Sequence, residues 1–316
     1  MMEYTSLGCT GLMVPPLCLG TGFWSTHTGV PEALEVMDHA LEVGLNFWDT
    51  ADSYASGGSE SVIGQGLKGR RQRVVLATKV HTRVAADPNK AGLSRTHIMR
   101  QVEASLGRLK TDYIDLYQMH RPDHQTPVEE TLRAFDDLVS QGKVRYIGSS
   151  NFSGAQLVET EWKGEANGFV VPSTEQSPLS LIRRGVESGV LPWCRKYGLA
   201  FLAYSPLARG ILAGKKYRPN QPVPKGSLVE EMGAHTEPWY PEALRVMERL
   251  ESHSQAKECS LSQFSLAWVA AQESVIPIMG ARTIEQIDDN LGALEVEITA
   301  EDLALVDELS PIGVLG

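Results

Sequence analysis

The segment Asn46–Glu60, NFWDTADSYASGGSE, contains the unit from which the fold is predicted. It begins as an apolar run typical of a buried strand, ends that run in a carboxylate at Asp49, and continues as a loop that carries Tyr54. Similar runs recur along the chain, each followed by a polar loop and an amphipathic helix. The eight strand-like runs are Leu17–Gly20, Asn46–Thr50, Val74–Val80, Ile114–His120, Val144–Ser149, Ser173–Gln176, Ala200–Tyr204 and Val275–Met279.

The helices between these runs carry their own local signals. Ser94 is a candidate N-cap, because its hydroxyl can accept a bond from a free N–H of the first turn. The helix after it has an apolar stripe made of Ile98, Val102, Leu106 and Leu109. Capping boxes, in which a cap residue is followed three positions later by Glu or Gln, are predicted at Thr126–Glu129, Ser153–Gln156 and Thr283–Gln286.

Strands that alternate with helices predict a parallel sheet of the α/β class. Eight such units in 316 residues predict a closed (β/α)8 TIM barrel, as a single domain over residues 1–316. A doubly wound sheet is the alternative, but Gly20-Thr21-Gly22 lacks the third glycine of a dinucleotide fingerprint. The segment from Leu207 to Pro241, after the seventh strand, is too long for a plain connection and predicts a lid or binding loop.

Composition argues against several classes of protein. The net charge of −10 is unlike the basic surface of a nucleic-acid binder. No apolar run is long enough to cross a membrane, and the N-terminus lacks the features of a signal peptide. Cys9, Cys18, Cys194 and Cys259 have the spacing of neither a metal site nor a disulfide framework. We therefore expect a cytoplasmic protein with reduced thiols, no metal and a small-molecule substrate; the oligomeric state stays open.

Polar residues gather where the strands of the predicted barrel end. The second run ends at Asp49 and is followed by Tyr54, the third carries Lys79 near its end, and the fourth ends at His120. Each residue alone has an ordinary structural explanation, such as a cap or a hydrogen-bonded core position. In a barrel, however, these ends meet at one mouth, and four such residues in consecutive units predict an active site.

The chemistry of the four residues is complementary. A tyrosine titrates near ~10 and is a weak acid at neutral pH, and a nearby ammonium group favours the phenolate and lowers its pKa. A lysine in a partly dry site tends to lose its proton unless a carboxylate keeps it charged. We therefore expect Asp49 to hold Lys79 cationic and Lys79 to tune Tyr54, while a neutral His120 orients a substrate carbonyl.

Asp49, Tyr54, Lys79 and His120 resemble the catalytic tetrad of the aldo-keto reductases. The surrounding strings also match in family order over nearly the whole chain: NFWDTADSY, LATKV, DLYQMHRPD, VRYIGSSNFS, TEQSPL, AYSPLARG and IPIMGARTIEQIDDN. These motifs are most similar to those of the bacterial and potassium-channel-β-like branch of the family. Two departures are ASGGSE after Tyr54, where a YGxGxSE-like run is common, and Trp48, where phenylalanine is usual.

The resemblance implies reversible, NADPH-dependent reduction of an aldehyde or ketone, with a sugar-derived compound as one option. Hydride would come from nicotinamide C4 and the proton from Tyr54. Arg282 would bind the 2′-phosphate that distinguishes NADPH from NADH; many relatives carry a lysine slightly earlier, where Ile278 and Met279 stand here. The remaining cofactor residues implied are Gly20, Thr21, Asp49, Ser150, Asn151, Gln176, Tyr204, Ser205, Leu207, Arg209, Gly210, Gly280, Gln286 and Asn290.

Within that set, Ser150, Asn151 and Gln176 would hold the carboxamide, Tyr204 would stack on the nicotinamide ring, and the Ser205–Gly210 segment would surround the pyrophosphate. The candidate substrate contacts are Trp24, His81 and Arg121, with Phe23, Trp239 and Tyr240 as further possibilities.

Two alternatives remain. One is a regulatory subunit that binds the cofactor and turns over slowly, and the other is a lyase that uses Lys79 as a Schiff base.

Overall fold

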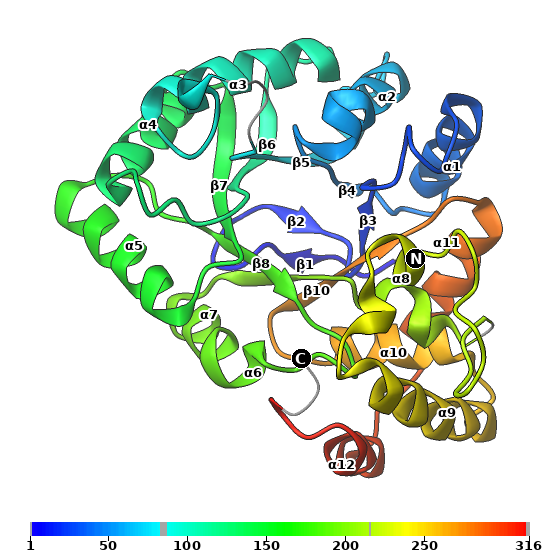
Figure 1. Cartoon of the computed structure of the whole chain (residues 1–316). Helices are drawn as coiled ribbons and strands as arrows, with labels where there is room; N and C mark the ends of the chain where they lie inside the picture. The colour runs from blue at the N-terminus through cyan, green and yellow to red at the C-terminus, as the bar shows by residue number, and fades with distance from the viewer. Residues whose placement is uncertain (1, 83–86, 215, 314–316) are drawn as a thin grey trace.

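The computed structural model describes residues 2–82, 87–214 and 216–313, and within them eight parallel strands close into one barrel. The strands follow the order β10-β3-β4-β5-β6-β7-β8-β9, so each barrel strand pairs with the one that precedes it in sequence and β10 closes the ring on β3. Figure 1 looks along the barrel and shows the helices as a ring around it. The predicted (β/α)8 TIM barrel is confirmed, and closure excludes the doubly wound alternative.

All eight strand-like runs form strands of this barrel. A parallel strand is covered on both faces, by the barrel interior and by the helices, and therefore reads as a continuous apolar run. In β5, for instance, all six residues are buried. The strands are β3 (Cys18–Gly20), β4 (Phe47–Asp49), β5 (Val75–Val80), β6 (Ile114–Met119), β7 (Val144–Ser150), β8 (Thr174–Pro178), β9 (Ala200–Tyr204) and β10 (Val275–Gly280).

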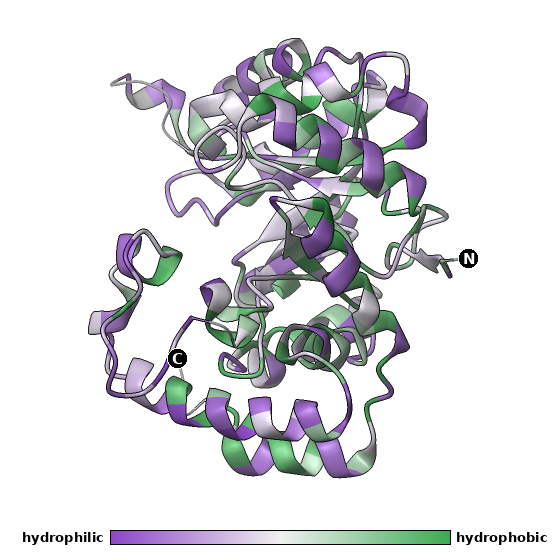
Figure 2. Ribbon diagram, turned by 90° about the vertical axis from the view of Figure 1, so that its right-hand side faces the viewer, coloured by the Kyte–Doolittle hydropathy of each residue, from purple (hydrophilic) through white to green (hydrophobic). Residues whose placement is uncertain are grey.

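The helices pack their apolar faces on the outside of the strands. Figure 2 shows hydrophilic and hydrophobic residues alternating along the helical ribbons, as expected of helices with one buried face. The helices are α1 (Val30–Glu42), α2 (Gly58–Gly66), α3 (Arg95–Leu109), α4 (Val128–Ser140), α5 (Gly154–Asn167), α6 (Val186–Gly189), α7 (Leu191–Tyr197), α8 (Leu228–Glu231), α9 (Tyr240–Ala256), α10 (Leu261–Ala270), α11 (Ile284–Leu291) and α12 (Ala300–Leu309).

The predicted helix starts are mostly confirmed. Ser94 caps α3, and Ser153 with Gln156 forms the expected capping box of α5. Thr283 caps α11, although the Gln286 side chain accepts from the N–H of Arg282 and not from that of the cap residue. The capping box predicted at Thr126 is wrong: α4 has Pro127 as its N-cap, because the Thr126 hydroxyl donates instead to Asp123 Oδ2 at 2.8 Å.

A short antiparallel hairpin, β1 (Thr5–Ser6) with β2 (Met13–Val14), precedes the barrel. Leu7 and Val14 from this region are fully buried and share a cluster with Phe47, Val75 and Ala200, which start their strands. The hairpin therefore covers the N-terminal end of the barrel. Its strands are two residues each, too short to show a periodic pattern in the sequence.

The long segment after β9 contains the 3-10 helix η4 (Ala208–Ala213), α8 and the 3-10 helix η5 (Ala234–Thr236) before α9 begins. It reaches the loop after β3, where His27 Nε2 lies 3.1 Å from Glu231 Oε2. The predicted long loop after the seventh strand is thus present, at the C-terminal end of the barrel. Among the helices of the described residues, none combines the length and the apolar character needed to cross a membrane.

Candidate active site

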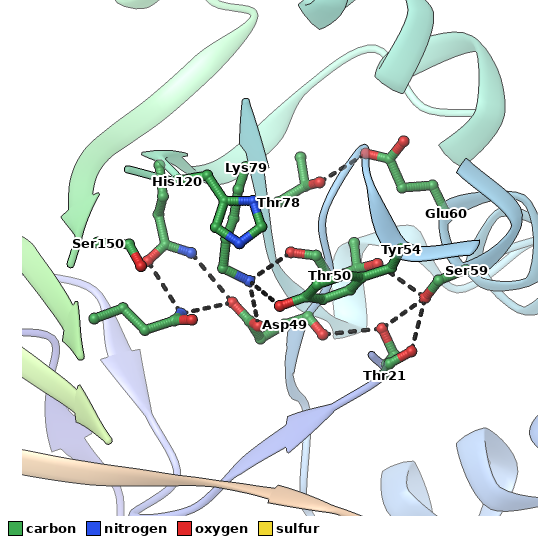
Figure 3. A network of polar contacts seen from close by, with 12 residues as sticks. Thr21, Asp49, Thr50, Tyr54, Ser59, Glu60, Thr78, Lys79, His120 and Ser150 are labelled. Atoms are coloured by element: carbon green, nitrogen blue, oxygen red, sulfur yellow. Dashed lines mark hydrogen bonds and ion pairs between the residues drawn. The ribbon is translucent and has the colours of Figure 1, made fainter. Parts of the chain in front are cut away.

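Lys79 lies at the centre of the polar residues at the strand ends. Its ammonium group donates to Asp49 Oδ2 at 2.6 Å, to the Thr50 carbonyl oxygen at 2.8 Å and to the Tyr54 hydroxyl at 3.3 Å. Asp49 ends β4, Lys79 belongs to β5 and Tyr54 opens the 3-10 helix η1 (Tyr54–Gly57). Figure 3 shows these side chains pointing toward one another. Carboxylate, amine and phenol are therefore in direct contact.

The turn that presents Tyr54 is strained. Ala55 and Ser56 adopt left-handed conformations with φ of 49° and 54°, and Gly57 follows with φ of 89°. Such backbone costs on the order of 1 kcal/mol or more for each non-glycine residue and persists where its surroundings enforce it. The strain is therefore concentrated in the ASGG segment that departs from the family pattern, directly after the phenol.

Burial and charge act against each other on this trio. Lys79 is completely buried, and burial lowers the pKa of its ammonium group; Asp49 and Tyr54 outweigh that effect, so the pKa of Lys79 is raised. Burial raises the pKa of Tyr54 above its ordinary value, and the opposing charge of Lys79 does not compensate. The expectation that Lys79 brings the pKa of Tyr54 below its ordinary value is therefore wrong for the free protein, and the phenol is protonated at neutral pH.

His120 follows β6 and stands beside Tyr54. The two ring centroids are 5.9 Å apart, and the rings are nearly perpendicular at 84°. Burial lowers the pKa of His120 to about 3, and the charges of Lys79, Arg121 and His81 add to that effect. The imidazole is therefore neutral at any physiological pH, as the sequence analysis expected.

Three further residues support the end of β4 from behind. The Thr21 hydroxyl donates to the Asp49 carbonyl oxygen at 2.9 Å and lies 2.9 Å from the Ser59 hydroxyl, which is also 2.9 Å from the Thr50 hydroxyl (Figure 3). Thr21 is fully buried. Its side chain thus fixes the backbone that carries Asp49, and no surface of Thr21 is left for a cofactor.

Ser150 ends β7 and Asn151 follows it, next to the tetrad. Asn151, with φ of 61°, donates from Nδ2 to Ser150 Oγ at 2.9 Å and to the His120 carbonyl oxygen at 3.2 Å. Its Oδ1 accepts from the Tyr204 hydroxyl at 2.9 Å. Three of the residues expected around the nicotinamide are therefore joined into one hydrogen-bonded group at the barrel mouth.

A second group lies at the start of α11. Arg282 and Gln286 line a cavity of about 320 Å³ together with Thr283, and its lining also includes Glu32 and His27. Asn290, expected to face the adenine, is 4% exposed and is not part of this wall. The cavity thus brings together Arg282 and Gln286 as expected and adds an acidic residue that the sequence analysis did not consider.

The glycines and tight turns of the expected cofactor region differ in their surroundings. A Cβ at Gly20 would lie 2.7 Å from Ile278 Cγ2, so this strand end admits only glycine without a shift. Gly280 instead faces open space, with nothing within 4 Å of a built Cβ. Ser205 and Arg209 have positive φ values of 54° and 59°, and Leu207 and Gly210 lie between and after them in a tightly turned segment.

The expected substrate residues differ in exposure. Trp24 is 1% exposed and donates from its indole to the Ala281 carbonyl oxygen at 3.2 Å, so it packs in the core and its assignment to the substrate is wrong. Its neighbour Phe23 is 39% exposed. His81 is half-buried and Arg121 is exposed, whereas Tyr240 is buried in α9.

Comparison with known proteins agrees with this geometry. The model of the Aldo/keto reductase family matches residues 16–311. This chain belongs to the aldo/keto reductase family. It is 41% identical to an uncharacterized oxidoreductase, YrpG, of Bacillus subtilis, with 98% of this chain and 96% of that protein covered. It is 32% identical to versiconal hemiacetal acetate reductase of Aspergillus parasiticus, over 97% and 96% of the two chains.

A third relative comes from a different functional group. A probable voltage-gated potassium channel subunit beta of rice, Oryza sativa, is 36% identical over 93% of this chain and 92% of its own. The family match, together with the relatives that are named as an oxidoreductase and a reductase, supports the assignment of this chain as an oxidoreductase.

In this member of the aldo/keto reductase family, Gln118 orients the Asp49 carboxylate, a role that was not predicted from the sequence. Gln118 Nε2 donates to Asp49 Oδ1 at 3.1 Å, and Gln176 Nε2 donates to the same oxygen at 2.9 Å. Both amides therefore hold Asp49 toward Lys79. The amide nitrogen of Gln176, which was expected to hold the carboxamide, is thus already bonded to Asp49. The missed signal is the two-residue period of a strand, which puts Gln118 on the same face of the chain as His120.

Glu175 is the second residue that was missed. It belongs to β8, is fully buried, and accepts from the Ser149 and Ser177 hydroxyls at 2.6 Å each and from the Phe152 N–H at 3.1 Å. These bonds hold Ser149 and Phe152, the residues that flank Ser150 and Asn151 in the sequence. Burial raises the pKa of Glu175 to about 7, although the four polar groups around it favour the charged form.

The pKa of Glu175 predicts how stability depends on pH. Because the folded-state pKa lies above that of an unfolded glutamate, the folded protein binds more protons and its free energy of unfolding falls as pH rises from about 4.5 to about 7. In Glu175→Gln the side chain at this position is neutral at every pH. The free energy of unfolding of this variant should therefore fall less over this range, and the two falls should differ by up to about 3 kcal/mol. Urea titrations at pH 5 and pH 8 measure the difference. The exposed Glu159→Gln is the control, and equal pH dependence in both variants would refute the assignment.

Proposed function

We propose that the chain is an NADPH-dependent reductase of aldehydes or ketones, with Tyr54 as proton donor. The contact of Lys79 with both Asp49 and Tyr54 carries this proposal. When bound, the reduced nicotinamide supplies the hydride. All other steps fall to residues of the chain: holding the carbonyl, transferring the proton and stabilising the charge that remains on the phenol.

Tyr54 is suited to the role of acid. It is protonated at neutral pH, which is the form that can donate to an alkoxide. After donation, the phenolate would lie 3.3 Å from the Lys79 ammonium group. The fixed positive charge of Lys79 stabilises the phenolate more than it stabilises the neutral phenol. Asp49 holds the ammonium group in place.

His120 is proposed to orient the carbonyl. Because its pKa is about 3, it is a neutral imidazole, which can donate one hydrogen bond without adding a second positive charge beside Lys79. Its Nδ1 is buried and has no hydrogen-bond partner among the described residues. A ligand near Tyr54 would supply a group that this ring can bind.

The residues around the cofactor region fit a nicotinamide dinucleotide phosphate. Ser150 and Asn151 offer both donors and acceptors to a carboxamide, and the open space at Gly280 and the cavity at Arg282 accommodate phosphate-bearing groups. Arg282 precedes the N-terminus of α11, where free N–H groups also favour an anion. These features support the proposal that the cofactor is NADPH and that Arg282 binds its 2′-phosphate.

Arg282→Ala and Glu32→Gln are expected to shift cofactor preference in opposite directions. Both side chains line the same cavity, so a 2′-phosphate is attracted by Arg282 and repelled by Glu32. Arg282→Ala should weaken NADPH about 10- to 100-fold relative to NADH, the cost of a hydrogen bond to a charged group. Glu32→Gln should strengthen NADPH and leave NADH nearly unchanged. Fluorescence titrations with both cofactors test this; equal losses for both cofactors in Arg282→Ala would contradict it.

The Schiff-base lyase is disfavoured. A lysine that attacks a carbonyl must be neutral, and a useful one has a lowered pKa. Lys79 instead has a raised pKa and is bonded to a carboxylate. Trapping with borohydride in the presence of a carbonyl compound should therefore leave the mass of the protein unchanged.

Turnover decides between the reductase and a slow regulatory subunit. The experiment is oxidation of NADPH, followed by its absorbance, with a panel of aldehydes, ketones and sugars. Rapid oxidation of NADPH with at least one compound supports the reductase, and binding of NADPH without multiple turnovers supports the regulatory alternative.

A further inference from the structure

Three arginines stand at the mouth of the barrel from three different loops. Arg121 follows His120 after β6, Arg183 lies in the loop after β8, and Arg209 lies in η4 after β9. Asn151 links the Tyr204 hydroxyl to the carbonyl oxygen of His120, the residue before Arg121, and the Leu179 N–H, at the start of the loop that carries Arg183, donates to the Tyr204 carbonyl oxygen at 3.4 Å. Burial raises the pKa of Tyr204, and the charges of Arg183, Arg121 and Arg209 oppose that rise. Arg121 also acts on His120 and His81. The three arginines therefore belong to loops at the end of the barrel that carries the tetrad, near Tyr204 and His120.

None of these three arginines has a carboxylate partner among the described residues. Ion pairs are formed by many other arginines of the chain, and the neighbour of Arg183 shows the contrast. Arg184 is 4% exposed and binds Glu187 at 2.6 Å and Asp307 at 2.7 Å, which ties α12 to the barrel. Arg183 itself is exposed. Its backbone N–H and carbonyl oxygen both form hydrogen bonds with the backbone of Ser180, which fix the turn that carries Arg183.

The nearby acid Asp123 does not neutralise this cluster. Its Oδ2 accepts from the Leu93 N–H at 2.7 Å and the Thr126 hydroxyl at 2.8 Å, and its Oδ1 accepts from the Gln125 N–H at 2.9 Å. These bonds hold the carboxylate in its own loop. In a chain with a net charge of −10, three free arginines at one opening create a local positive field against the overall charge.

The cofactor does not account for all of this charge. In the proposed function, Arg209 serves the pyrophosphate and Arg282 the 2′-phosphate, which leaves Arg121 and Arg183. Arg121 is the residue next to His120, so an anionic group held by it would lie close to a carbonyl between His120 and Tyr54. Guanidinium groups match carboxylate and phosphate oxygens through paired N–H donors.

Resting on the proposed function, we propose that the substrate is an aldehyde or ketone that also carries a carboxylate or phosphate group, bound by Arg121 and Arg183. The two arginines select this class by attracting the anion into a mouth that the rest of the protein's charge would repel. The carbonyl is thereby placed at Tyr54 and His120.

Two matched substrate pairs test this inference and separate its two ligand sources. One pair is 4-carboxybenzaldehyde with its methyl ester, and the other is glyceraldehyde 3-phosphate with glyceraldehyde. We expect kcat/KM to be about tenfold or more higher for the charged member of at least one pair, and this preference to fall as ionic strength rises. The pair that shows it identifies the anion as carboxylate or phosphate.

Variants assign the effect to residues. Arg121→Gln and Arg183→Gln should each reduce the preference for the charged member about 10- to 100-fold, the range for hydrogen bonds between charged groups. Arg145→Gln is the matched control, because Arg145 is also exposed without a carboxylate partner among the described residues but lies at the N-terminal end of β7. This control should keep the preference of the unmodified protein.

The outcomes distinguish two kinds of failure. If NADPH is oxidised equally fast with both members of each pair, the proposed function stands and the anionic-substrate inference is overturned. A rise in the Kd of NADPH in Arg121→Gln and Arg183→Gln, with the preference retained, would assign both arginines to the cofactor and also overturn it. If no member of either pair is reduced while another compound of the carbonyl panel is, the anionic-substrate inference is overturned and the proposed function stands; if no compound of the panel is reduced, the proposed function itself fails.

Discussion

Replacing Tyr54 by phenylalanine is expected to lower kcat for carbonyl reduction by about 10²- to 10⁴-fold, the usual contribution of a positioned acid. The aromatic ring stays, so the packing against His120 and Gly22 is retained. Only the hydroxyl that contacts Lys79 is lost. Since this hydroxyl lies among the catalytic residues and apart from the Arg282 cavity, the Kd of NADPH should change little.

Tyr117→Phe is a matched control for this experiment. Tyr117 lies on β6, is fully buried, and its hydroxyl has no hydrogen-bond partner among the described residues. Removing that hydroxyl should leave kcat unchanged and should not reduce stability. If Tyr54→Phe kept full activity while Tyr117→Phe behaved as expected, the proton would have to come from another group, and the role given to Tyr54 would be wrong.

The pH dependence of the reaction provides a second check on the acid. His120 has a pKa of about 3 and does not titrate between pH 5 and pH 9. The pKa of Tyr54 is raised, so its proton is present over the same range. The kcat for reduction should therefore be flat near neutrality and fall only in alkaline solution. Because Glu175 has a pKa of about 7, the profile is measured in Glu175→Gln as well. A step near pH 6 to 7 that persists in this variant would indicate that a histidine supplies the proton.

The barrel was predictable because its determinants are local and repeated. Most strands read as apolar runs, although β8, TEQSP, is polar, and several helices have an apolar stripe and a start signal, as α3 has with Ser94. The hairpin β1–β2 was not predictable, since two-residue strands have no period. The cap at Thr126 failed because a tertiary partner, Asp123, binds the hydroxyl that would otherwise cap α4.

The proximity of Asp49, Lys79 and Tyr54 could be predicted from their places at the ends of strands, but their pKa values could not. The pKa of Tyr54 depends on how completely the phenol is buried, which no spacing in the sequence records. The burial of Trp24 likewise depends on a partner 257 positions away, the Ala281 carbonyl oxygen. Gln118 was missed for a different reason: its role depends on two neighbouring strands that bring it to Asp49.

The ion pair between Lys79 and Asp49 should be as important for stability as for catalysis. Their side chains are 1% and 4% exposed, so Lys79→Met leaves a buried carboxylate without its ammonium partner. Breaking such a pair typically costs about 3–5 kcal/mol. Urea unfolding should show this loss as a lower midpoint with an unchanged slope.

The double variant Asp49→Asn/Lys79→Met distinguishes a pair effect from simple loss of packing. Because it removes both charges, it should recover much of the stability lost in Lys79→Met, while both remain inactive. Lys79 has a raised pKa, so its stabilising contribution is present below about pH 10 and is lost as pH rises through the folded-state pKa. The difference between the unmodified protein and Lys79→Met should accordingly shrink in strongly alkaline solution. If the double variant were as unstable as the sum of the two single variants, the two charges would be energetically independent, and Asp49 could not be what keeps Lys79 ionised beside Tyr54.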